Sequence, residues 1–315
     1  MTADYFVVGP TIALSGCIAP GSELALRVST GRPKLSAWIS TVVEASRIKL
    51  QLSGDELPPA MQVEALRLFA RLADRLSPGN LPVFVGADSF AERAEDLLHD
   101  GFVPSNRGWL RGRGPFLRKQ RTDSFEGVYL DAFTVPWNFV PREVECLQPI
   151  VDFASTAKRT QSVLDLGFGF GKNATWLEDQ ALDVHGVEIS STATDRARQL
   201  VRHPRRFHNA SATNLPFADC SFDAVLDVGC LHCIPARERP AAAKEICRVL
   251  RPGGFVSSRV FRPRDRAWVQ RQPFEVDSFG LSDADIIKIF DPLLNMRIWR
   301  DHPDMIYLCG TRNDT

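Results

Sequence analysis

The stretch Ser162–Asn173, which reads SVLDLGFGFGKN, constrains the fold of this chain more than any other. A short apolar run that contains Asp165 is followed by glycines at alternate positions, Gly167, Gly169 and Gly171, and then by a helical pattern. Short apolar runs bounded by turn signals are typical of buried parallel strands. Glycines let the backbone turn sharply and approach a ligand closely, and the amides at the start of a helix attract polar ligand groups. The stretch therefore predicts a strand, a loop and a helix that hold a small molecule at the carboxyl edge of an α/β sheet.

The spacing of the glycines narrows the kind of ligand. Dinucleotide sites carry the pattern G-x-G-x-x-G, whereas this loop reads G-x-G-x-G. The next apolar segment, Asp183–Ile189 (DVHGVEI), places a carboxylate at Glu188. A carboxylate at that point can accept hydrogen bonds from ribose hydroxyls, which suits a dinucleotide or another adenosyl compound.

Two later stretches add to this pattern. Ser211–Asp227 reads SATNLPFADCSFDAVLD, and Arg248–Phe255 reads RVLRPGGF. In this order, the segments resemble the motifs of the class I S-adenosylmethionine (SAM) dependent methyltransferases, in particular of those that act on small molecules. The resemblance implies an α/β fold with a seven-stranded Rossmann-like sheet whose last strand is antiparallel. It also implies that SAM is the cofactor.

The family's motifs assign the binding of SAM to residues of this glycine loop and of the strand ends beside it. These are Asp165, Gly167, Phe168, Gly169, Gly171, Asn173, Glu188, Ile189, Ser211, Ala212, Asp227 and Val228.

Three positions depart from the family pattern. Ser211 stands where the family usually has Asp, so a hydroxyl replaces the carboxylate that would contact the adenine amino group. Phe168 and Phe170 are larger than the residues usually found between these glycines. We expect them to make the loop more apolar and to press on the methionine part of SAM.

Asp227 and His232, just past the fourth strand, are the candidates for a catalytic general base. His232 lies in GCLHCIP, which is similar to the L-H-H-hydrophobic-P stretch of related methyltransferases. Its ordinary pKa suits acid–base catalysis, but the histidine of that stretch is often structural, and Asp227 could instead orient the ammonium group of SAM. The sequence pattern predicts the fourth strand at Phe222–Val228, the fifth strand at Phe255–Phe261 and a final hairpin formed by Asn295–Arg300 and Met305–Thr311. The segment Phe261–Gly280 follows the fifth strand, and we expect it to form part of the acceptor pocket or its lid. The residues predicted to contact the acceptor are Trp137, Asn138, His232, Arg259, Arg262 and Trp268.

The chain is predicted to form two domains, with residues 1–122 as a smaller N-terminal α+β domain and residues 123–315 as the SAM-binding domain. Ala87–Phe102, ADSFAERAEDLLHDGF, resembles the late helix and turn of the GNAT acetyltransferases. The place of the family's glycine-rich coenzyme A loop reads LSGDELPPAM, however, with one glycine and two prolines. We therefore expect a degenerate half-GNAT-like domain that shapes the substrate pocket. The aromatic residues Phe133, Trp137 and Phe139 are predicted either to cover the cofactor or to bridge the domains.

Composition limits the partners. Lysine plus arginine equals aspartate plus glutamate, at 38 each, so the chain lacks the overall positive charge of a nucleic-acid binder. A basic stretch, Asn106–Arg121, leaves RNA contact open, with a solvated hairpin or linker as the alternative. The seven cysteines are scattered, which is typical of reduced thiols in the cytoplasm, and Cys230 and Cys233 lack the second pair that a metal site needs. We expect no metal, no membrane span and a cytoplasmic location, and the oligomeric state is left open.

The favoured function is methyl transfer from SAM to a small-molecule metabolite by in-line displacement, with the acceptor atom left open. One alternative is a SAM-dependent enzyme that transfers no methyl group and instead releases methylthioadenosine by cyclisation or elimination. Another is an RNA or protein methyltransferase whose N-terminal domain reads the substrate. A binding module without catalysis is disfavoured, because Asp165, the loop glycines and Glu188 are all present.

Overall fold

The fold was analysed in a computed structural model. It describes residues 3–8, 12–18, 25–30, 37–44, 47–54, 57–76, 83–86, 102–105, 108–111, 125–130, 135–139, 144–157, 161–265, 280–291, 294–299 and 303–313. The chain forms two compact units. The N-terminal unit comprises Met1–Lys119 and Asp131–Arg142, and the C-terminal unit comprises Gln120–Leu130 and Glu143–Thr315. Each unit therefore contains two separate segments of the chain, and the predicted domain boundary after residue 122 stays a prediction.

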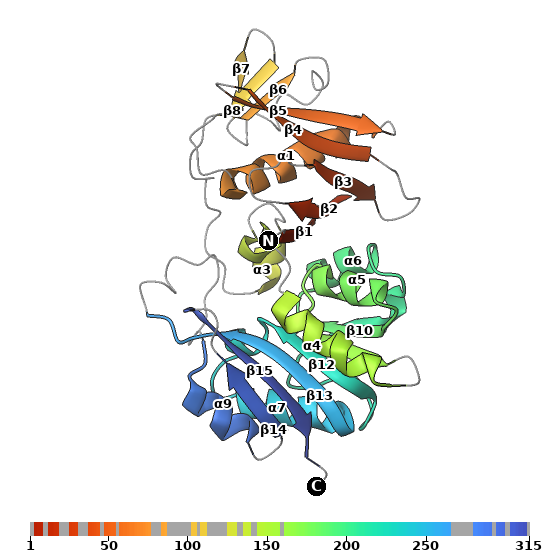
Figure 1. The fold of residues 1–315 in the computed structure, drawn as a ribbon, viewed down its shortest axis with the longest axis vertical. Coiled ribbons are helices and arrows are strands. Elements are labelled where there is room, and N and C mark those ends of the chain that lie inside the picture. The colour runs from red at the N-terminus through yellow and green to blue at the C-terminus, as the bar shows by residue number, and fades with distance from the viewer. Residues whose placement is uncertain are drawn as a thin grey trace. The chain divides into compact units, whose positions relative to one another are not determined.

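A seven-stranded sheet forms the centre of the C-terminal unit, in the order β11-β10-β9-β12-β13-β15-β14 (Figure 1). Its strands run parallel, apart from β15, which is antiparallel to both β13 and β14. The strand order reverses between β9 and β12, and ligands of open α/β sheets bind at such a point. The strands are β9 (Ser162–Leu166), β10 (Asp183–Glu188), β11 (Phe207–Asn209), β12 (Phe222–Val228), β13 (Leu250–Phe261), β14 (Leu294–Trp299) and β15 (Met305–Arg312).

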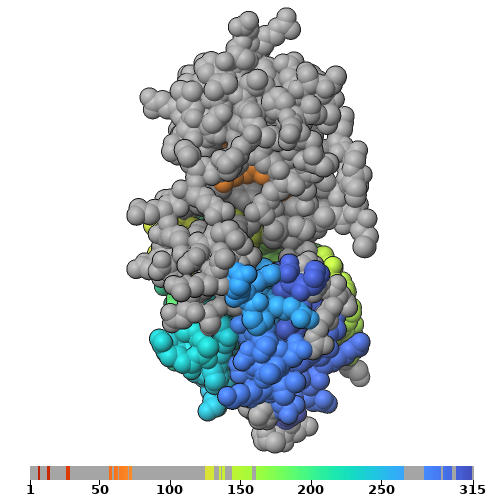
Figure 2. All heavy atoms as spheres, turned by 90° about the vertical axis from the view of Figure 1, so that its left-hand side faces the viewer, coloured from red at the N-terminus to blue at the C-terminus, as the bar shows by residue number. Residues whose placement is uncertain are grey.

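Helices cover both faces of this sheet. One core cluster joins α4, α5 and α6 to the sheet through residues such as Leu147, Leu177 and Ala197. The other joins α7 and α9 to the opposite face through Ile246 and Phe290. In the space-filling view, blue residues of the C-terminal part lie beside the cyan residues near position 230 (Figure 2). The helices are α3 (Phe125–Tyr129), α4 (Val144–Ser155), α5 (Lys172–Asp179), α6 (Ser191–Arg198), α7 (Arg239–Val249) and α9 (Asp283–Phe290), and the 3-10 helices are η4 (Pro204–Arg206) and η5 (Leu231–Cys233).

This architecture confirms the predicted α/β class and the Rossmann-like sheet with an antiparallel last strand. The fifth strand is longer than the predicted Phe255–Phe261, because Leu250 already pairs with Phe222 before a register shift. Two helices in this unit have the caps that start a helix well. Ser190 accepts a hydrogen bond from Ala193 at the start of α6, and Ser282 forms a capping box at the start of α9.

The N-terminal unit contains an eight-stranded sheet in the order β1-β2-β3-β4-β5-β6-β8-β7. Its neighbours are antiparallel apart from the pair β5–β6. The helix α1, which connects that parallel pair, buries an apolar stripe that includes Leu66, Phe69 and Leu72. The elements are β1 (Ala3–Val8), β2 (Ile12–Ile18), β3 (Ala25–Thr30), β4 (Ala37–Glu44), β5 (Arg47–Gly54), α1 (Pro59–Leu76), β6 (Val83–Gly86), β7 (Phe102–Ser105), β8 (Gly108–Arg111) and the 3-10 helix η3 (Pro136–Phe139).

The half-GNAT interpretation of this unit stays a prediction. The sheet and α1 agree with an α+β domain. However, nearly all of the GNAT-like segment Ala87–Phe102, most of the basic stretch Asn106–Arg121 and Phe133 lie outside the described residues. None of the helices among the residues described above is long and apolar enough to cross a membrane.

Candidate functional site

The glycine loop lies at the carboxyl end of β9, next to the reversal of strand order. Gly167, Gly169 and Gly171 all have positive φ angles, of 69°, 55° and 80°. The Gly167 amide donates to the carbonyl oxygen of Val187 on β10 at 2.7 Å, which holds the loop against the sheet. A β-carbon on Gly167 would lie 2.7 Å from the Cβ of Cys230. Residue 167 must therefore be glycine both for its backbone conformation and for the close approach of the chain after β12.

Glu188 connects the loop to the end of β10. Its side chain is buried, and its two oxygens accept hydrogen bonds from the amides of Gly169 at 2.9 Å and Ser190 at 3.0 Å. Burial raises the pKa of Glu188 above its ordinary value, although the two amides favour the charged form. A carboxylate oxygen accepts more than one hydrogen bond, so these contacts orient Glu188 and leave acceptor capacity for a ligand.

Asp165 is buried inside β9, directly before the loop. One of its oxygens, Oδ2, is shielded from solvent and has no hydrogen-bond partner among the described residues. Burial, together with the nearby carboxylates of Asp227 and Glu188, raises the pKa of Asp165 to about 8. An unpartnered buried polar atom at a strand end is the kind of group that a ligand completes.

Asp227 lies at the end of β12, the strand that neighbours β9. Its Oδ1 accepts from the amides of Cys230 at 2.8 Å and Leu231 at 3.2 Å, and its Oδ2 accepts from the Ser258 hydroxyl at 2.5 Å. Burial raises the pKa of Asp227 to about 6, against the effect of these donors. The contacts show that Asp227 fixes the turn that leads to His232, a positioning role. Its predicted role as a general base stays a prediction.

His232 lies in η5 and is buried. Its Nδ1 accepts a hydrogen bond from the amide of Phe261 at 3.2 Å, and its ring packs edge-on against the ring of Phe261. Burial, Arg259 and Arg239 hold the pKa of His232 well below its ordinary value. The imidazole is therefore neutral at physiological pH, and because Nδ1 is an acceptor, its proton is on Nε2.

The remaining predicted cofactor residues line the same edge. Ile189, next to Glu188, is 62% exposed, which is unusual for an apolar side chain at a strand end. The side chain of Asn209 donates to the carbonyl oxygens of Glu188 and Ile189 and so fixes the backbone there. Ser211 forms a local turn with Thr213, with 2.8 Å between the two hydroxyl oxygens.

Asn173, Ala212 and Val228 lie in three different parts of the C-terminal unit. Asn173 is in the first turn of α5, Ala212 lies in a turn after β11 and packs against the core, and Val228 of β12 pairs with Arg259.

Phe168 occupies a place that differs from its predicted one. Its ring is buried in the core under α5 and α6, edge-on to Phe207 at 5.1 Å between ring centroids. The side chain fills the space above Gly186, where a β-carbon would come within 2.4 Å of the ring. The expected pressure of this ring on the methionine part of SAM has no support in this packing.

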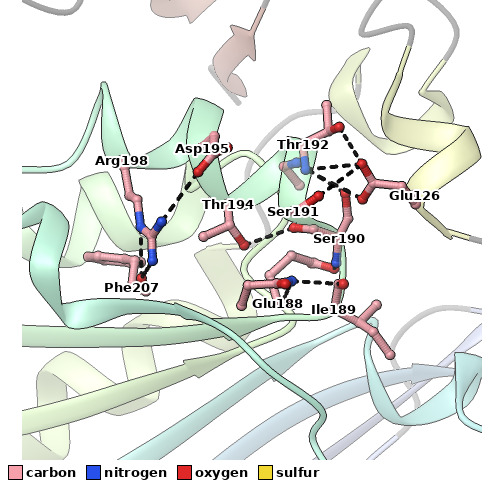
Figure 3. Close-up of polar contacts among 12 residues, drawn as sticks. Glu126, Glu188, Ile189, Ser190, Ser191, Thr192, Thr194, Asp195, Arg198 and Phe207 are labelled. Carbon is pink, nitrogen blue, oxygen red and sulfur yellow. Dashed lines mark hydrogen bonds and ion pairs between the residues drawn. The ribbon is translucent and has the colours of Figure 1, made fainter.

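A segment that the sequence analysis did not assign to the site lies against the glycine loop. The hydroxyl of Tyr129, on α3, would meet a β-carbon on Gly169 at 2.8 Å, and its ring packs edge-on against Phe170 at 5.0 Å. On the same helix, Glu126 accepts hydrogen bonds from the amide of Thr192 and from the hydroxyls of Ser191 and Thr192 (Figure 3). The helix α3 therefore joins the loop to the start of α6, whereas the sequence analysis placed the covering aromatic residues further along, at 133–139.

The predicted acceptor residues are distributed over separate parts of the chain. Arg259 lies within β13, and the backbone amide of Arg262 donates to the carbonyl oxygen of Asp304 at 2.9 Å. Trp137 and Asn138 belong to η3 in the N-terminal unit, and Trp268 lies outside the described residues. Their role in acceptor binding stays a prediction.

Within the described ranges, no group of three or more His, Cys, Asp or Glu side chains is arranged to hold a metal ion. Cys230 and Cys233 are close to the site, but burial raises the pKa of both thiols. Protonated thiols are poor metal ligands. The arrangement suits an organic ligand instead, because a glycine cradle, an exposed apolar side chain and the carboxyl groups of Asp165, Glu188 and Asp227 come together at one edge of the sheet.

Comparison with known proteins agrees with this geometry. Residues 164–258, which run from β9 to β13, match a family model described as a methyltransferase domain. Methyltransferase GfsG from Streptomyces halstedii is 38% identical over 98 residues, which cover 29% of this chain and 34% of that protein. The phthiotriol/phenolphthiotriol dimycocerosates methyltransferase of Mycobacterium tuberculosis is 34% identical over 113 residues, which cover 34% of this chain and 41% of that protein. The chain thus spans well under half the length of these curated relatives.

Among solved structures, a similar one is the 1,6-didemethyltoxoflavin-N1-methyltransferase of Burkholderia thailandensis with bound 1,6-didemethyltoxoflavin and S-adenosylhomocysteine. It is 20% identical, with a TM-score of 0.43, and the match covers 55% of this chain and 80% of that one.

Proposed function

We propose that residues 164–258, which match a methyltransferase domain, form a class I SAM-dependent methyltransferase and that the protein transfers the methyl group of SAM to a small-molecule acceptor. The observation that carries the proposal is the combination of the glycine loop with buried Asp165, Glu188 and Asp227 at the reversal of strand order. A carboxylate-rich, partly apolar site is complementary to a ligand that has positive charge and an adenosine group. The matched domain of the relatives supports the same conclusion.

The chain's own residues supply orientation and electrostatics, because SAM when bound supplies the activated methyl group. Glu188 is placed to accept the ribose hydroxyls, and Ile189 offers an apolar surface for the adenine ring. Asp227 holds the turn of η5 so that neutral His232 lies at the same edge of the sheet. In this arrangement His232 can donate a hydrogen bond from Nε2 to the acceptor, whereas its Nδ1 could receive a proton only if the hydrogen bond from the Phe261 amide broke.

The first test of this proposal is binding, measured by calorimetry with SAM, S-adenosylhomocysteine, NAD and acetyl-CoA. We expect binding of the two adenosyl sulfur compounds and none of the others. Glu188→Ala should weaken the binding of SAM by about 1–3 kcal/mol, the range for hydrogen bonds to charged groups. Glu178→Ala is a matched control, since Glu178 is also buried but accepts from the Arg202 amide, away from the loop. Tight binding of NAD without any response to SAM would contradict the proposal.

The second test identifies the reaction by its products. Incubation of the enzyme with SAM and a metabolite extract, followed by mass spectrometry, should yield S-adenosylhomocysteine and a compound that is heavier by one methylene unit. Release of methylthioadenosine would indicate the alternative in which no methyl group is transferred. Methyl transfer only to added RNA or protein would indicate a macromolecular acceptor.

For the N-terminal unit we propose a role in shaping the acceptor pocket, without chemistry of its own. Its support is the sheet and helix with their own apolar core, together with the absence of a glycine-rich coenzyme A loop in the sequence. A chain that begins at Thr122 retains α3 and all of the C-terminal sheet. We expect it to bind SAM weakly and to lose turnover. Full turnover by this shorter chain, once shown to be folded, would exclude the proposed role.

A further inference from the structure

The short helix α3 contacts the candidate site at two separate points. At its carboxyl end, the hydroxyl of Tyr129 would lie 2.8 Å from a β-carbon on Gly169, and the ring of Tyr129 packs edge-on against Phe170. Near its start, Glu126 reaches the first turn of α6, which begins just after β10. The helix thus bridges the carboxyl ends of β9 and β10. A ligand bound by the glycine loop and Glu188 would lie between the two elements that α3 joins.

The link at Glu126 is polar and directional. Its carboxylate accepts hydrogen bonds from the amide of Thr192, at 3.2 Å to Oε1 and 3.4 Å to Oε2, from the hydroxyl of Ser191 at 3.2 Å, and from the hydroxyl of Thr192 (Figure 3). Amides in the first turn of a helix have no acceptor within that helix, and the helix dipole favours a negative charge beside them. Burial acts to raise the pKa of Glu126, but these hydrogen bonds leave it lowered, so the carboxylate is charged at neutral pH.

The position of α3 depends on contacts of this kind. The helix has only five residues, and a helix of that length is not stable by itself in water. Val128 and Tyr129 are buried, whereas Leu130, directly after the helix, is 64% exposed. Apolar burial therefore holds one side of α3, and Glu126 adds a charged contact that fixes the helix relative to the start of α6.

We propose that Glu126 is a positioning residue that retains the cofactor: by tying α3 to α6, it holds the helix against the glycine loop and so slows the dissociation of SAM. This inference rests on the proposed SAM site. Glu126 acts through the two elements that it joins and does not need to touch the ligand. Weakening the tie should therefore raise the dissociation rate constant of SAM. The association rate constant should not fall, because the ligand enters while the tie is open.

The test is the release of tritiated SAM from the full-length protein after a chase with unlabelled SAM. Glu126→Ala removes all of the hydrogen bonds to α6, and we expect the dissociation rate constant to rise about tenfold, as for the loss of one hydrogen bond to a charged group. Glu126→Gln keeps an acceptor oxygen without the charge and should give a rise of about two- to fivefold. Asp195→Asn is the matched control, because Asp195 lies on α6 but accepts from Arg198 on the same helix. It should release SAM at the wild-type rate.

Substitutions at Thr192 test the same tie from its other side. Thr192→Val removes the hydroxyl that donates to Glu126, whereas Thr192→Ser keeps it. We expect faster release of SAM from Thr192→Val and wild-type release from Thr192→Ser. The double variant Glu126→Ala/Thr192→Val should release SAM no faster than Glu126→Ala, because the second substitution acts on a tie that is already broken. A general loss of stability would instead add the effects of the two substitutions.

The outcomes separate this inference from the proposed function. Release of SAM at the wild-type rate from folded Glu126→Ala would overturn the inference and leave the proposed function intact. Equal effects of Glu126→Ala and Asp195→Asn, or weaker binding through slower association alone, would also overturn it. If Glu126→Ala does not fold, the comparison of Thr192→Val with Thr192→Ser decides the question, and equal release from these two variants would refute the tie. Failure of the wild type to bind SAM would instead contradict the proposed function itself.

Discussion

Replacement of Gly167 by alanine tests the closest approach of chain segments in the site. Gly167 and Gly253 have the same φ, 69°, so an alanine at either position carries the same backbone strain of about 1–2 kcal/mol. The two positions differ in the space beside them. A β-carbon at Gly167 would lie 2.7 Å from Cβ and 3.0 Å from Sγ of Cys230, whereas at Gly253 nothing lies within 4 Å. Overpacking of this kind costs about 1–3 kcal/mol, so Gly167→Ala should destabilise the fold by that much more than Gly253→Ala.

The assay is urea unfolding of the two variants and the wild type, with the slope of the transition used to check that the unfolding mechanism is unchanged. The double variant Gly167→Ala/Cys230→Gly should recover part of the loss, since it removes the atoms nearest to the new methyl group. Equal losses for Gly167→Ala and Gly253→Ala would refute the reasoning. They would mean that the turn after β12 does not press on the glycine loop.

Two further predictions concern groups whose charge the fold controls. Burial acts to raise the pKa of Glu126, but hydrogen bonds from Thr192, Ser190 and Ser191 outweigh it and leave the pKa lowered. Glu126→Gln should therefore lower the free energy of unfolding by about 0.3–1 kcal/mol at pH 7. In denaturant titrations this difference should vanish as the pH falls through the folded-state pKa of Glu126, which lies below the ordinary value of about 4.3. A constant difference down to acidic pH would show that the contacts do not depend on charge. The pKa of His232 is lowered by burial and by Arg259 and Arg239, so the unfolded chain takes up a proton below about pH 6.5 that the folded chain refuses. Wild-type stability should thus decline on acidification below that pH more steeply than that of His232→Gln, and parallel declines would indicate that His232 is charged in the folded protein.

Local sequence predicted much of the C-terminal unit. The fourth strand, Phe222–Val228, has the predicted bounds, and the final hairpin lies within a residue of its predicted position. These strands could be predicted from the sequence because a buried strand needs a continuous apolar run, and such a run can be recognised in a few consecutive residues. The glycine loop could also be predicted locally, because backbone positions with positive φ angles strongly favour glycine and the loop has them at alternate positions.

Contacts across long sequence separations could not be predicted in this way. The fifth strand begins at Leu250 because Leu250 pairs with Phe222. The local sequence RVLRPGGF does not indicate this pairing. The ring of Phe168 turns into the core because Gly186 leaves room for it beside Phe207. Tyr129 and Glu126 were missed as part of the site because α3 is a short helix with no motif, and its partners at 169–170 and 191–192 lie far along the chain.

The sequence by itself determined that a strand, a glycine loop and a helix would present Asp165, Glu188 and Asp227 at one edge of a sheet. Only the tertiary structure decided the states of these groups. Burial and two neighbouring carboxylates raise the pKa of Asp165, and its Oδ2 has no donor among the described residues, while Asp227 is held by two amides and a hydroxyl. The physical reason is that a charge is set by burial and by the groups within a few ångströms, and those groups come from strands that are adjacent in space and far apart in the chain.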